Sequence, residues 1–271
     1  MATVKIGLDA GHGLKTSGKQ TPDGIKEWTL NDKVRDKVVK FLADYDCEIV
    51  HTDNNEGKVD ETLADRLAMY KKKGCAVFVS IHHNANTGKW NNATGVEVFT
   101  DRTPTAKDKE LANCIYTRLV KYTGLKGRGI KVKDFWVINQ DTIPAVLVEG
   151  GFMDGVSDYK YITSDAGQTA YAKAVAEGLI EFCNLKKKKK ATTAASTKKP
   201  TTAATTSTKY FKKYTGSSGS LVDALKAIGA TSTFAYRKKI AKANGIKTYL
   251  GTGSQNTKLL NLLKKGKLIK P

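Results

Sequence analysis

The sequence predicts an α/β fold, with a twisted and mostly parallel sheet flanked by helices, followed by a small and mainly helical C-terminal domain. Over residues 1–185, short apolar runs typical of strands alternate with longer segments of helical periodicity. Two segments that contain histidine directly follow two of these runs, at the position where the ligand-binding edge of an α/β sheet is expected. Beyond residue 185 the chain becomes basic and low in complexity, which indicates a change of domain.

The expected elements of the first domain alternate along the chain. We expect Asp60 to cap the second helix, and Asp165 with Gln168 to form a capping box before the last one. A domain of this length can bury a stable core without disulfides, and no pair of the four cysteines has C-x-x-C spacing, so we expect reduced, buried thiols. The expected strands are 3–8, 47–51, 76–81, 95–100, 134–138 and 145–149, and the expected helices are 28–44, 61–73, 105–122 and 166–182.

All of the net charge lies in the last third of the chain. Residues 1–185 contain 25 Lys+Arg and 25 Asp+Glu, whereas residues 186–271 contain 21 Lys+Arg and a single acid, Asp223. This asymmetry favours a catalytic body joined to an anchor for a polyanion, the alternative being solubility alone. The chain opens without the apolar run of a signal peptide, and no run is long enough to span a membrane, so we expect synthesis in a cytoplasm and no membrane insertion.

The basic part divides into a linker and a domain. Residues 186–209 consist of a lysine run and Thr/Ala/Ser repeats, which cannot offset the entropy of ordering, so we expect a disordered linker. Residues 210–271 regain apolar residues on two helical faces, one through Leu221 and Leu225 and the other through Leu259 and Leu263. A faint repeat precedes each face, with Tyr214 and Gly216 before the first, and Tyr249 and Gly251 before the second.

Two segments of the first domain hold three of the four histidines: DAGHG at 9–13 and SIHHNA at 80–85. Two histidines and one carboxylate form a known catalytic zinc set that leaves a position for water. His12 and His82 are the histidine candidates, and Glu27 is the carboxylate candidate. Glu149 ends the apolar run PAVLV and precedes two glycines, which favours it as a proton shuttle. A single strand-end histidine is more often structural, but two of them with a strand-end glutamate favour a site.

These blocks resemble one family when they are taken in order. DAGHG, a following Glu, S-I-H-x-N-A and PAVLVEGGFM are similar to the zinc N-acetylmuramoyl-L-alanine amidases of the type-3 class, over roughly residues 3–183. The resemblance implies the zinc amidase fold and one Zn²⁺ per chain, held by His12, Glu27 and His82. It also implies that Glu149 is the catalytic residue and that Arg66 in the second helix is structural.

The chain departs from that family's pattern at two places. His83 stands where the family often has a small residue, and the segment after the second strand is His51-Thr52-Asp53 instead of the common Thr-Arg. Because side chains alternate along an extended segment, His82 and His83 cannot both face the ion in the same way. The motif favours His82, and we expect His83 and Asn84 to contact substrate. The role of His51 stays open, with a surface histidine as the simpler interpretation.

The tail resembles the wall-binding modules that end some endolysins and autolysins of clostridia and their phages. By this resemblance, Tyr214, Gly216, Tyr249 and Gly251 would contact the wall; a plain helical domain with coincidental turns is the alternative. The whole layout is similar to phage endolysins, which implies synthesis in the host cytoplasm, release, and lysis at a Gram-positive wall through peptidoglycan and its anionic polymers.

Four other functions fit parts of the sequence. A bacterial autolysin would share the same chemistry, and a zinc peptidase or de-N-acetylase would share the metal site. A nucleic-acid-binding protein would explain the lysines, but these lie in a low-complexity linker and a short module without a recognised motif. A catalytically dead wall-binding protein is disfavoured because all four site candidates are present. The sequence predicts no oligomeric state.

Overall fold

A six-stranded sheet forms the centre of the first of two units in the computed structural model. The structure describes residues 3–139, 142–188, 210–216, 218–232, 234–246, 249 and 253–271. The first unit spans Met1–Thr193 and the second spans Ala194–Pro271, and each has a hydrophobic core of its own. Residues 189–209 of the predicted linker lie outside the described residues, so its disorder stays a prediction.

The sheet is mixed and mostly parallel, in the order β2-β1-β3-β6-β4-β5. β1 pairs in parallel with β2 and β3, and β3 pairs in parallel with β6. β4 is antiparallel to β6 and parallel to β5. The predicted α/β class is therefore confirmed. The strands are β1 (Val4–Ala10), β2 (Cys47–His51), β3 (Val77–Asn84), β4 (Val96–Thr100), β5 (Gly127–Val132) and β6 (Ala145–Phe152).

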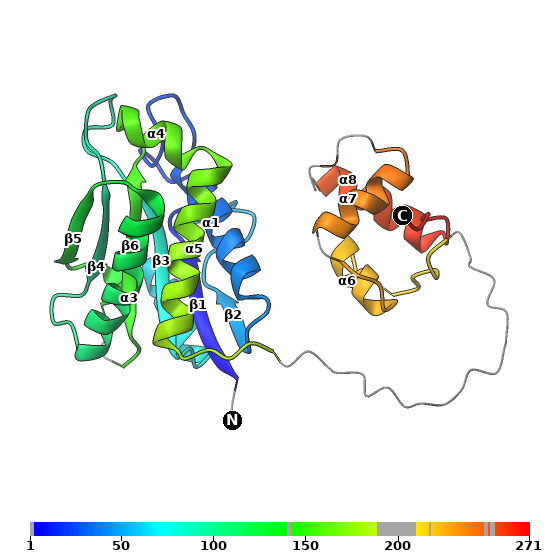
Figure 1. Cartoon of the computed structure of the whole chain (residues 1–271), viewed down its shortest axis with the longest axis horizontal. Helices are drawn as coiled ribbons and strands as arrows, with labels where there is room; N and C mark the ends of the chain where they lie inside the picture. Colours follow the sequence, from blue (N-terminus) through cyan, green and yellow to red (C-terminus); the bar gives the residue numbers. More distant parts are fainter. Residues whose placement is uncertain are drawn as a thin grey trace. The chain divides into compact units, whose positions relative to one another are not determined.

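Helices cover both faces of the sheet. Figure 1 shows α1, α3 and α5 together across one face, where they bury the largest apolar cluster of the unit. α2 and a short 3₁₀ turn, η1, pack over a smaller apolar cluster on the opposite face. The elements are α1 (Glu27–Leu42), α2 (Leu63–Lys72), α3 (Ala106–Thr123), η1 (Trp136–Ile138), α4 (Val156–Ile162) and α5 (Asp165–Phe182).

Side chains along each strand alternate between these two faces. The odd-numbered apolar residues of β3 join the core under α1, α3 and α5. Phe78 points the other way, and its ring stacks on Tyr70 of α2 with centroids 4.1 Å apart. His82 lies four residues after Phe78 and Glu149 lies two residues after Leu147 on β6, so both side chains belong to this second face. Strand periodicity therefore places the predicted site opposite the three-helix layer.

The predicted strand at 134–138 is wrong. The strand lies earlier, at Gly127–Val132, and the apolar residues after it form η1. β5 is an edge strand whose Ile130 and Val132 remain 38% and 58% exposed, so it lacks the continuous apolar run of the central strands. Gly127 is required there because a Cβ would lie 2.5 Å from the hydroxyl of Tyr116.

Two predicted helix starts are displaced. Thr62, not Asp60, caps α2, because its hydroxyl accepts from the backbone N–H of Asp65. Ser164, not Asp165, caps α5 by accepting from the N–H of Gly167. The Gln168 side chain donates to backbone carbonyls of the preceding segment instead of closing a capping box. The short helix α4 was not predicted.

The second unit contains α6 (Leu221–Ala227), α7 (Phe234–Ala243) and α8 (Gly253–Lys264) among its described residues. Both predicted helical faces are buried in its core. Tyr214 and Tyr249 belong to the same core, with 9% and 3% exposure. Gly216 packs against Tyr214, since a Cβ there would lie 2.3 Å from the hydroxyl. Gly251 lies outside the described residues, and the wall contacts of all four stay predictions.

All four cysteines are free thiols, but burial holds for only two of them: Cys75 and Cys114 are buried, whereas Cys47 and Cys183 are partly exposed. Within the described ranges, no helix is both long enough and apolar enough to cross a bilayer.

Candidate metal centre and catalytic cleft

The loop after β1 brings His12 to the end of β3. The N–H of Gly11 donates to the carbonyl of Ile81 at 3.0 Å, which continues the pairing of the two strands. A Cβ at Gly11 would lie 2.0 Å from the His82 ring, so only glycine allows this approach. His12 itself has a φ of +68°, a left-handed conformation that is costly for a residue with a side chain and typical of functional turns.

Glu27 joins the two histidines. It is the first residue of α1, and only 2% of its side chain is exposed. One carboxylate oxygen lies 3.3 Å from Nε2 of His12, and the other lies 3.0 Å from Nδ1 of His82. The three ligand atoms all lie within 4.8 Å of one another. The structure thus brings together the three residues predicted from separate parts of the sequence.

The chemistry of this donor set fits zinc. Two imidazole nitrogens and one carboxylate oxygen are a known catalytic set, and zinc needs its carboxylate ligand ionised. Burial opposes ionisation of Glu27, but the contacts of its carboxylate with His12 and His82 outweigh burial and hold its pKa well below the usual value. His12, Glu27 and His82 would therefore hold the ion without a further protein ligand.

His83 points to the other side of β3, as strand alternation requires. Its ring is 2% exposed and packs edge-on against Tyr171 of α5, with centroids 5.5 Å apart. Burial lowers the pKa of His83 to about 4, although the nearby Glu27 acts in the opposite direction. His82, and not His83, joins the cluster with His12 and Glu27. Whether His83 contacts substrate stays a prediction.

Asn31, which was not predicted, links the parts of this centre. Its amide nitrogen donates to the carbonyl of Gly11 at 3.1 Å and to Glu27 at 3.3 Å. Its amide oxygen lies 2.7 Å from Nδ1 of His83. Asn31 lies four residues after Glu27 on α1, a spacing that places both side chains on one helical face and could have identified it.

Glu149 lies beside this centre and lines the same cavity. Its Oε2 is buried and has no partner among the described residues. The pKa of Glu149 is raised well above the usual value, first by burial and then by the negative charges of Glu27 and Glu97. The sequence had indicated that Glu149 ends its strand. β6 instead continues through Gly150 and Gly151 to Phe152, so Glu149 lies within the strand.

A second buried carboxylate, Glu97, was not predicted. It is the Cα partner of Glu149 on β4, and it accepts from the amide of Asn84 at 2.5 Å. Burial would raise its pKa, but Lys131 and Arg128 bind the carboxylate and lower it instead. Two neighbouring carboxylates thus have opposite pKa shifts, an arrangement that separates acid–base roles in enzymes. A glutamate inside the apolar strand 95–100 was the available signal.

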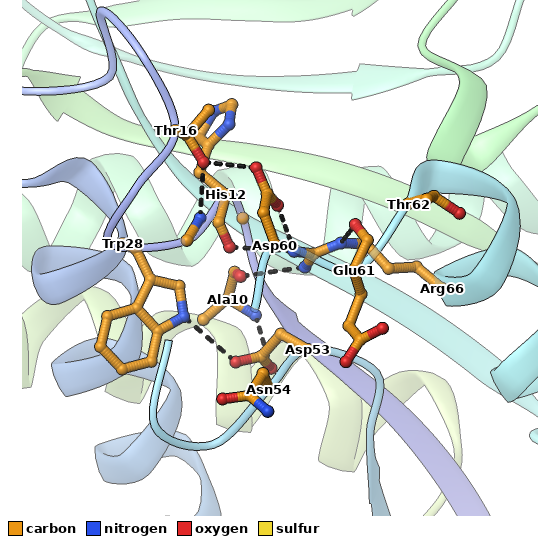
Figure 2. A network of polar contacts seen from close by, with 12 residues as sticks. Ala10, His12, Thr16, Trp28, Asp53, Asn54, Asp60, Glu61, Thr62 and Arg66 are labelled. Carbon is orange, nitrogen blue, oxygen red and sulfur yellow. Dashed lines mark hydrogen bonds and ion pairs between the residues drawn. The ribbon is translucent and has the colours of Figure 1, made fainter. Parts of the chain in front are cut away.

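Arg66 holds the backbone that carries His12 (Figure 2). Its guanidinium donates to the carbonyls of Ala10 and His12, at 3.1 and 2.9 Å, and binds Asp9 at 2.5 Å and Asp60 at 3.0 Å. The side chain is 2% exposed. These contacts support the structural role implied for Arg66.

The segment His51-Thr52-Asp53, which departs from the family pattern, supports the loop after β1. Asp53 accepts from the N–H of Ala10 at 3.2 Å and from the indole of Trp28 at 3.3 Å (Figure 2). His51 lies outside the candidate metal cluster and is half-buried, and its Nδ1 has no partner among the described residues. The departure from Thr-Arg therefore leaves the ligand set untouched.

The candidate metal ligands and Glu149 line one cavity of about 360 Å³. Its walls include two exposed lysines, Lys19 and Lys133, and Trp136 of η1, which is 56% exposed. Within the described part of the chain, neither lysine has a carboxylate partner, whereas Lys131 is bound to Glu97. The site residues that line the cavity are His12, Glu27, His82, His83, Asn84 and Glu149.

Comparisons with known proteins match the first unit to one family. A family model described as N-acetylmuramoyl-L-alanine amidase matches residues 6–181. An endolysin of Bacillus phage SPP1 is 35% identical over 185 residues, which cover 67% of this chain and 67% of that protein. The sporulation-specific N-acetylmuramoyl-L-alanine amidase of Bacillus subtilis is 29% identical over 186 residues, covering 68% of this chain and 70% of that protein.

Solved structures give the same result. The catalytic domain of the amidase CwlV from Bacillus (Paenibacillus) polymyxa superposes with a TM-score of 0.62 at 29% identity, covering 68% of this chain and 99% of that one. An N-acetylmuramoyl-L-alanine amidase from Clostridium difficile 630 superposes with a TM-score of 0.64 at 26% identity, covering 68% and 98%. Both matches cover about the length of the first unit.

Proposed function

The chain belongs to the N-acetylmuramoyl-L-alanine amidase family, and from this premise we propose that it hydrolyses the muramoyl-L-alanine amide of peptidoglycan with a zinc ion held by His12, Glu27 and His82. The observation that carries the proposal is the convergence of these three ligand atoms within 4.8 Å, beside a buried carboxylate with one oxygen that has no partner among the described residues. Three protein ligands and an open position are typical of catalytic zinc sites, and a carboxylate beside them can serve as a general base.

Glu149 is the group suited to move the proton. A zinc ion in this centre would polarise the scissile carbonyl and lower the pKa of a water towards neutrality. Glu149 then accepts one proton from the attacking water and delivers it to the alanine nitrogen as the C–N bond breaks. The new C–O bond leaves a free lactyl carboxylate on one product and a free amino group on the other. General acid–base catalysis of this kind contributes about 10²–10⁴-fold.

The walls of the cavity suit an acidic peptide joined to a sugar. Unamidated stem peptides carry a free carboxylate one residue beyond the L-alanine, and Lys19 and Lys133 present ammonium groups in the cavity. The exposed indole of Trp136 offers an apolar surface to the sugar ring. Lys133→Gln should lower kcat/KM for a free-acid muropeptide more than for its amidated form, whereas Lys109→Gln on α3 should change neither.

We further propose that the second unit and the preceding basic segment hold the enzyme on anionic wall polymers. The charge of +20 within residues 186–271 supports this, because electrostatic attraction to a polyanionic wall raises the local concentration of enzyme on an insoluble substrate. Release to the wall and lysis of a Gram-positive host complete the endolysin proposal. The matches include a phage endolysin and a bacterial sporulation amidase, so an autolysin remains the second candidate.

The experiment is turbidity clearing of purified walls from several species, with and without a chelator. We expect clearing that stops in chelator and returns with added zinc. Clearing by metal-free protein would contradict the zinc proposal. A peptidase or de-N-acetylase would also need the metal, so the released groups must separate these activities from an amidase.

A further inference from the structure

A chain of buried hydrogen bonds connects His82 to the interior of the sheet. Nε2 of His82 lies 3.1 Å from the hydroxyl oxygen of Ser80, and that hydroxyl donates to Oδ2 of Asp9 at 2.7 Å. Ser80 lies two residues before His82 on the same face of β3, and Asp9 is its Cα partner on β1. Asp9 and Ser80 are 1% and 0% exposed. The relay is therefore built into the pairing of two central strands.

The direction of each hydrogen bond in this relay is fixed by Asp9. Arg66 binds Oδ1 of Asp9 at 2.5 Å, and the hydroxyl of Thr52 donates to the same oxygen at 2.9 Å. An ionised carboxylate only accepts hydrogen bonds, so the single hydroxyl proton of Ser80 must go to Asp9. The Ser80 oxygen is then left as an acceptor, and Nε2 of His82 must carry the proton that it accepts. The reverse order would set oxygen lone pairs of Ser80 and Asp9 against each other at 2.7 Å.

We propose that Asp9 and Ser80 are positioning residues that hold His82 in the Nε2–H tautomer, so that Nδ1 is the nitrogen that binds the metal. Nδ1 is the atom that lies 3.0 Å from Glu27, whose other carboxylate oxygen lies 3.3 Å from Nε2 of His12. The inference rests on the proposed metal centre. Asp9 of DAGHG and Ser80 of SIHHNA are not metal ligands, and the inference gives each of them a role in positioning His82.

Such support changes metal binding measurably. A carboxylate that orients a metal-binding histidine typically contributes 10–100-fold to metal affinity, because it fixes the tautomer and the ring orientation. Here the carboxylate acts through a hydroxyl, and Arg66 holds the carboxylate in place. The same guanidinium also donates to the carbonyl of His12, so one buried side chain supports two of the three ligands.

Nitrogen NMR of the wild-type protein tests the tautomer without any variant. Ring-labelled histidines in the zinc-loaded protein should show Nε2 of His82 protonated and Nδ1 without a proton. Replacing zinc with ¹¹³Cd should give metal–nitrogen coupling to Nδ1. Coupling to Nε2 of His82 would overturn the proposal. Failure to bind any metal would contradict the proposed function itself, a different result.

Ser80→Ala tests the relay and has a matched control in the same structure. Thr52→Val removes the other hydroxyl that donates to Asp9 but leaves the bond to His82 intact. Competition with a chelator should show zinc affinity 10–100-fold lower for Ser80→Ala and within about threefold of wild type for Thr52→Val. Thermal unfolding of the metal-free proteins should be similar for the two variants, which would separate metal positioning from general stability. Equal zinc affinities in both variants would overturn the relay.

Discussion

His82 and Glu149 are Cα partners on the adjacent parallel strands β3 and β6. Side chains at paired positions of neighbouring strands point to the same face, so a candidate metal ligand and a candidate proton acceptor lie side by side. β4 extends the row, because Glu97 is the Cα partner of Glu149 on the other side. The central sheet thus fixes the spacing of the candidate ligand, the candidate base and the neighbouring carboxylate, and no long loop has to order before they meet.

The first prediction concerns metal content. We expect about one zinc per chain in the purified protein, with metal lost in His12→Ala and Glu27→Ala because each removes one of three ligands. His82→Ala should lose far more zinc than His83→Ala, since the His83 ring lies on the opposite face of β3. Elemental analysis of dialysed proteins measures this. The reverse order for the two neighbours would show that the ligand had been assigned to the wrong histidine.

The second prediction separates the base from the ligands. Glu149→Gln keeps the size of the side chain and removes the proton acceptor, so zinc content and thermal stability should stay near wild type. Hydrolysis should fall on the order of 10²-fold or more. Rates on a soluble muropeptide measure the effect, with Glu110→Gln on the exposed face of α3 as the control. Near-normal turnover in Glu149→Gln would leave Glu149 a structural residue.

The third prediction follows from burial of His83. Its pKa in the folded state is about 4, because burial disfavours the charged ring, whereas an unfolded histidine titrates near 6.5. As the pH falls below about 6.5, the unfolded state therefore takes up a proton that the folded state does not. The His83 contribution to folding stability is complete above that pH and is lost between about 6.5 and 4, with a loss of about 2 kcal/mol by pH 5.

Urea unfolding in the presence of a chelator measures this loss without interference from bound metal. Other groups also titrate in this range, so the comparison is with His83→Gln, which cannot protonate. Between pH 8 and pH 5 the variant should lose less unfolding free energy than wild type, by about 2 kcal/mol. Equal losses in the two proteins would show that His83 is as accessible to protons in the folded state as in the unfolded one.

The fourth prediction separates the two units. Residues 1–188 should cleave soluble wall fragments, because they contain every proposed site residue. The cut is placed at 188 because the backbone of Lys188 still donates to Asp44 and Lys187 bridges to Tyr45. Residues 210–271 should bind whole walls without cleaving them. Labelled proteins and purified walls measure both activities.

Salt distinguishes two kinds of wall binding by the second unit. General attraction should weaken steeply between 0.1 M and 1 M salt, as the Debye length falls from about 10 to about 3 Å. Recognition of a specific wall structure should survive high salt and differ between species. Indiscriminate binding that disappears at 1 M salt would reduce the unit to a polycationic anchor.

The sequence predicted where the candidate site residues lie, because strand periodicity determines much of their placement. The face that carries His82 and Glu149 follows from alternation along two buried strands, and the ligand order follows from the resemblance. Glu27 was a carboxylate candidate from the sequence, but only the fold shows that the start of α1 meets the ends of β1 and β3. Asn31 and Glu97 were missed because their roles depend on partners far away in sequence.

The less accurate predictions lie where tertiary contacts decide local structure. β5 is a half-exposed edge strand rich in glycine and basic residues, so its pattern resembles a loop. At the start of α2, Asp60 was the predicted cap. The carboxylate of Asp60 instead binds Arg66, and the hydroxyl of Thr62 caps the helix. Such choices depend on contacts that are distant in sequence.

The central claim is cleavage of the muramoyl-L-alanine amide, and the chemistry of the released groups tests it most directly. Purified peptidoglycan is incubated with the zinc-loaded protein, new amino termini are labelled and identified, and Glu149→Gln serves as the blank. The account predicts that L-alanine is the new amino terminus, with intact glycan strands that carry free lactyl groups. New termini from any other stem residue, free acetate, or new reducing sugar ends without terminal L-alanine would contradict it.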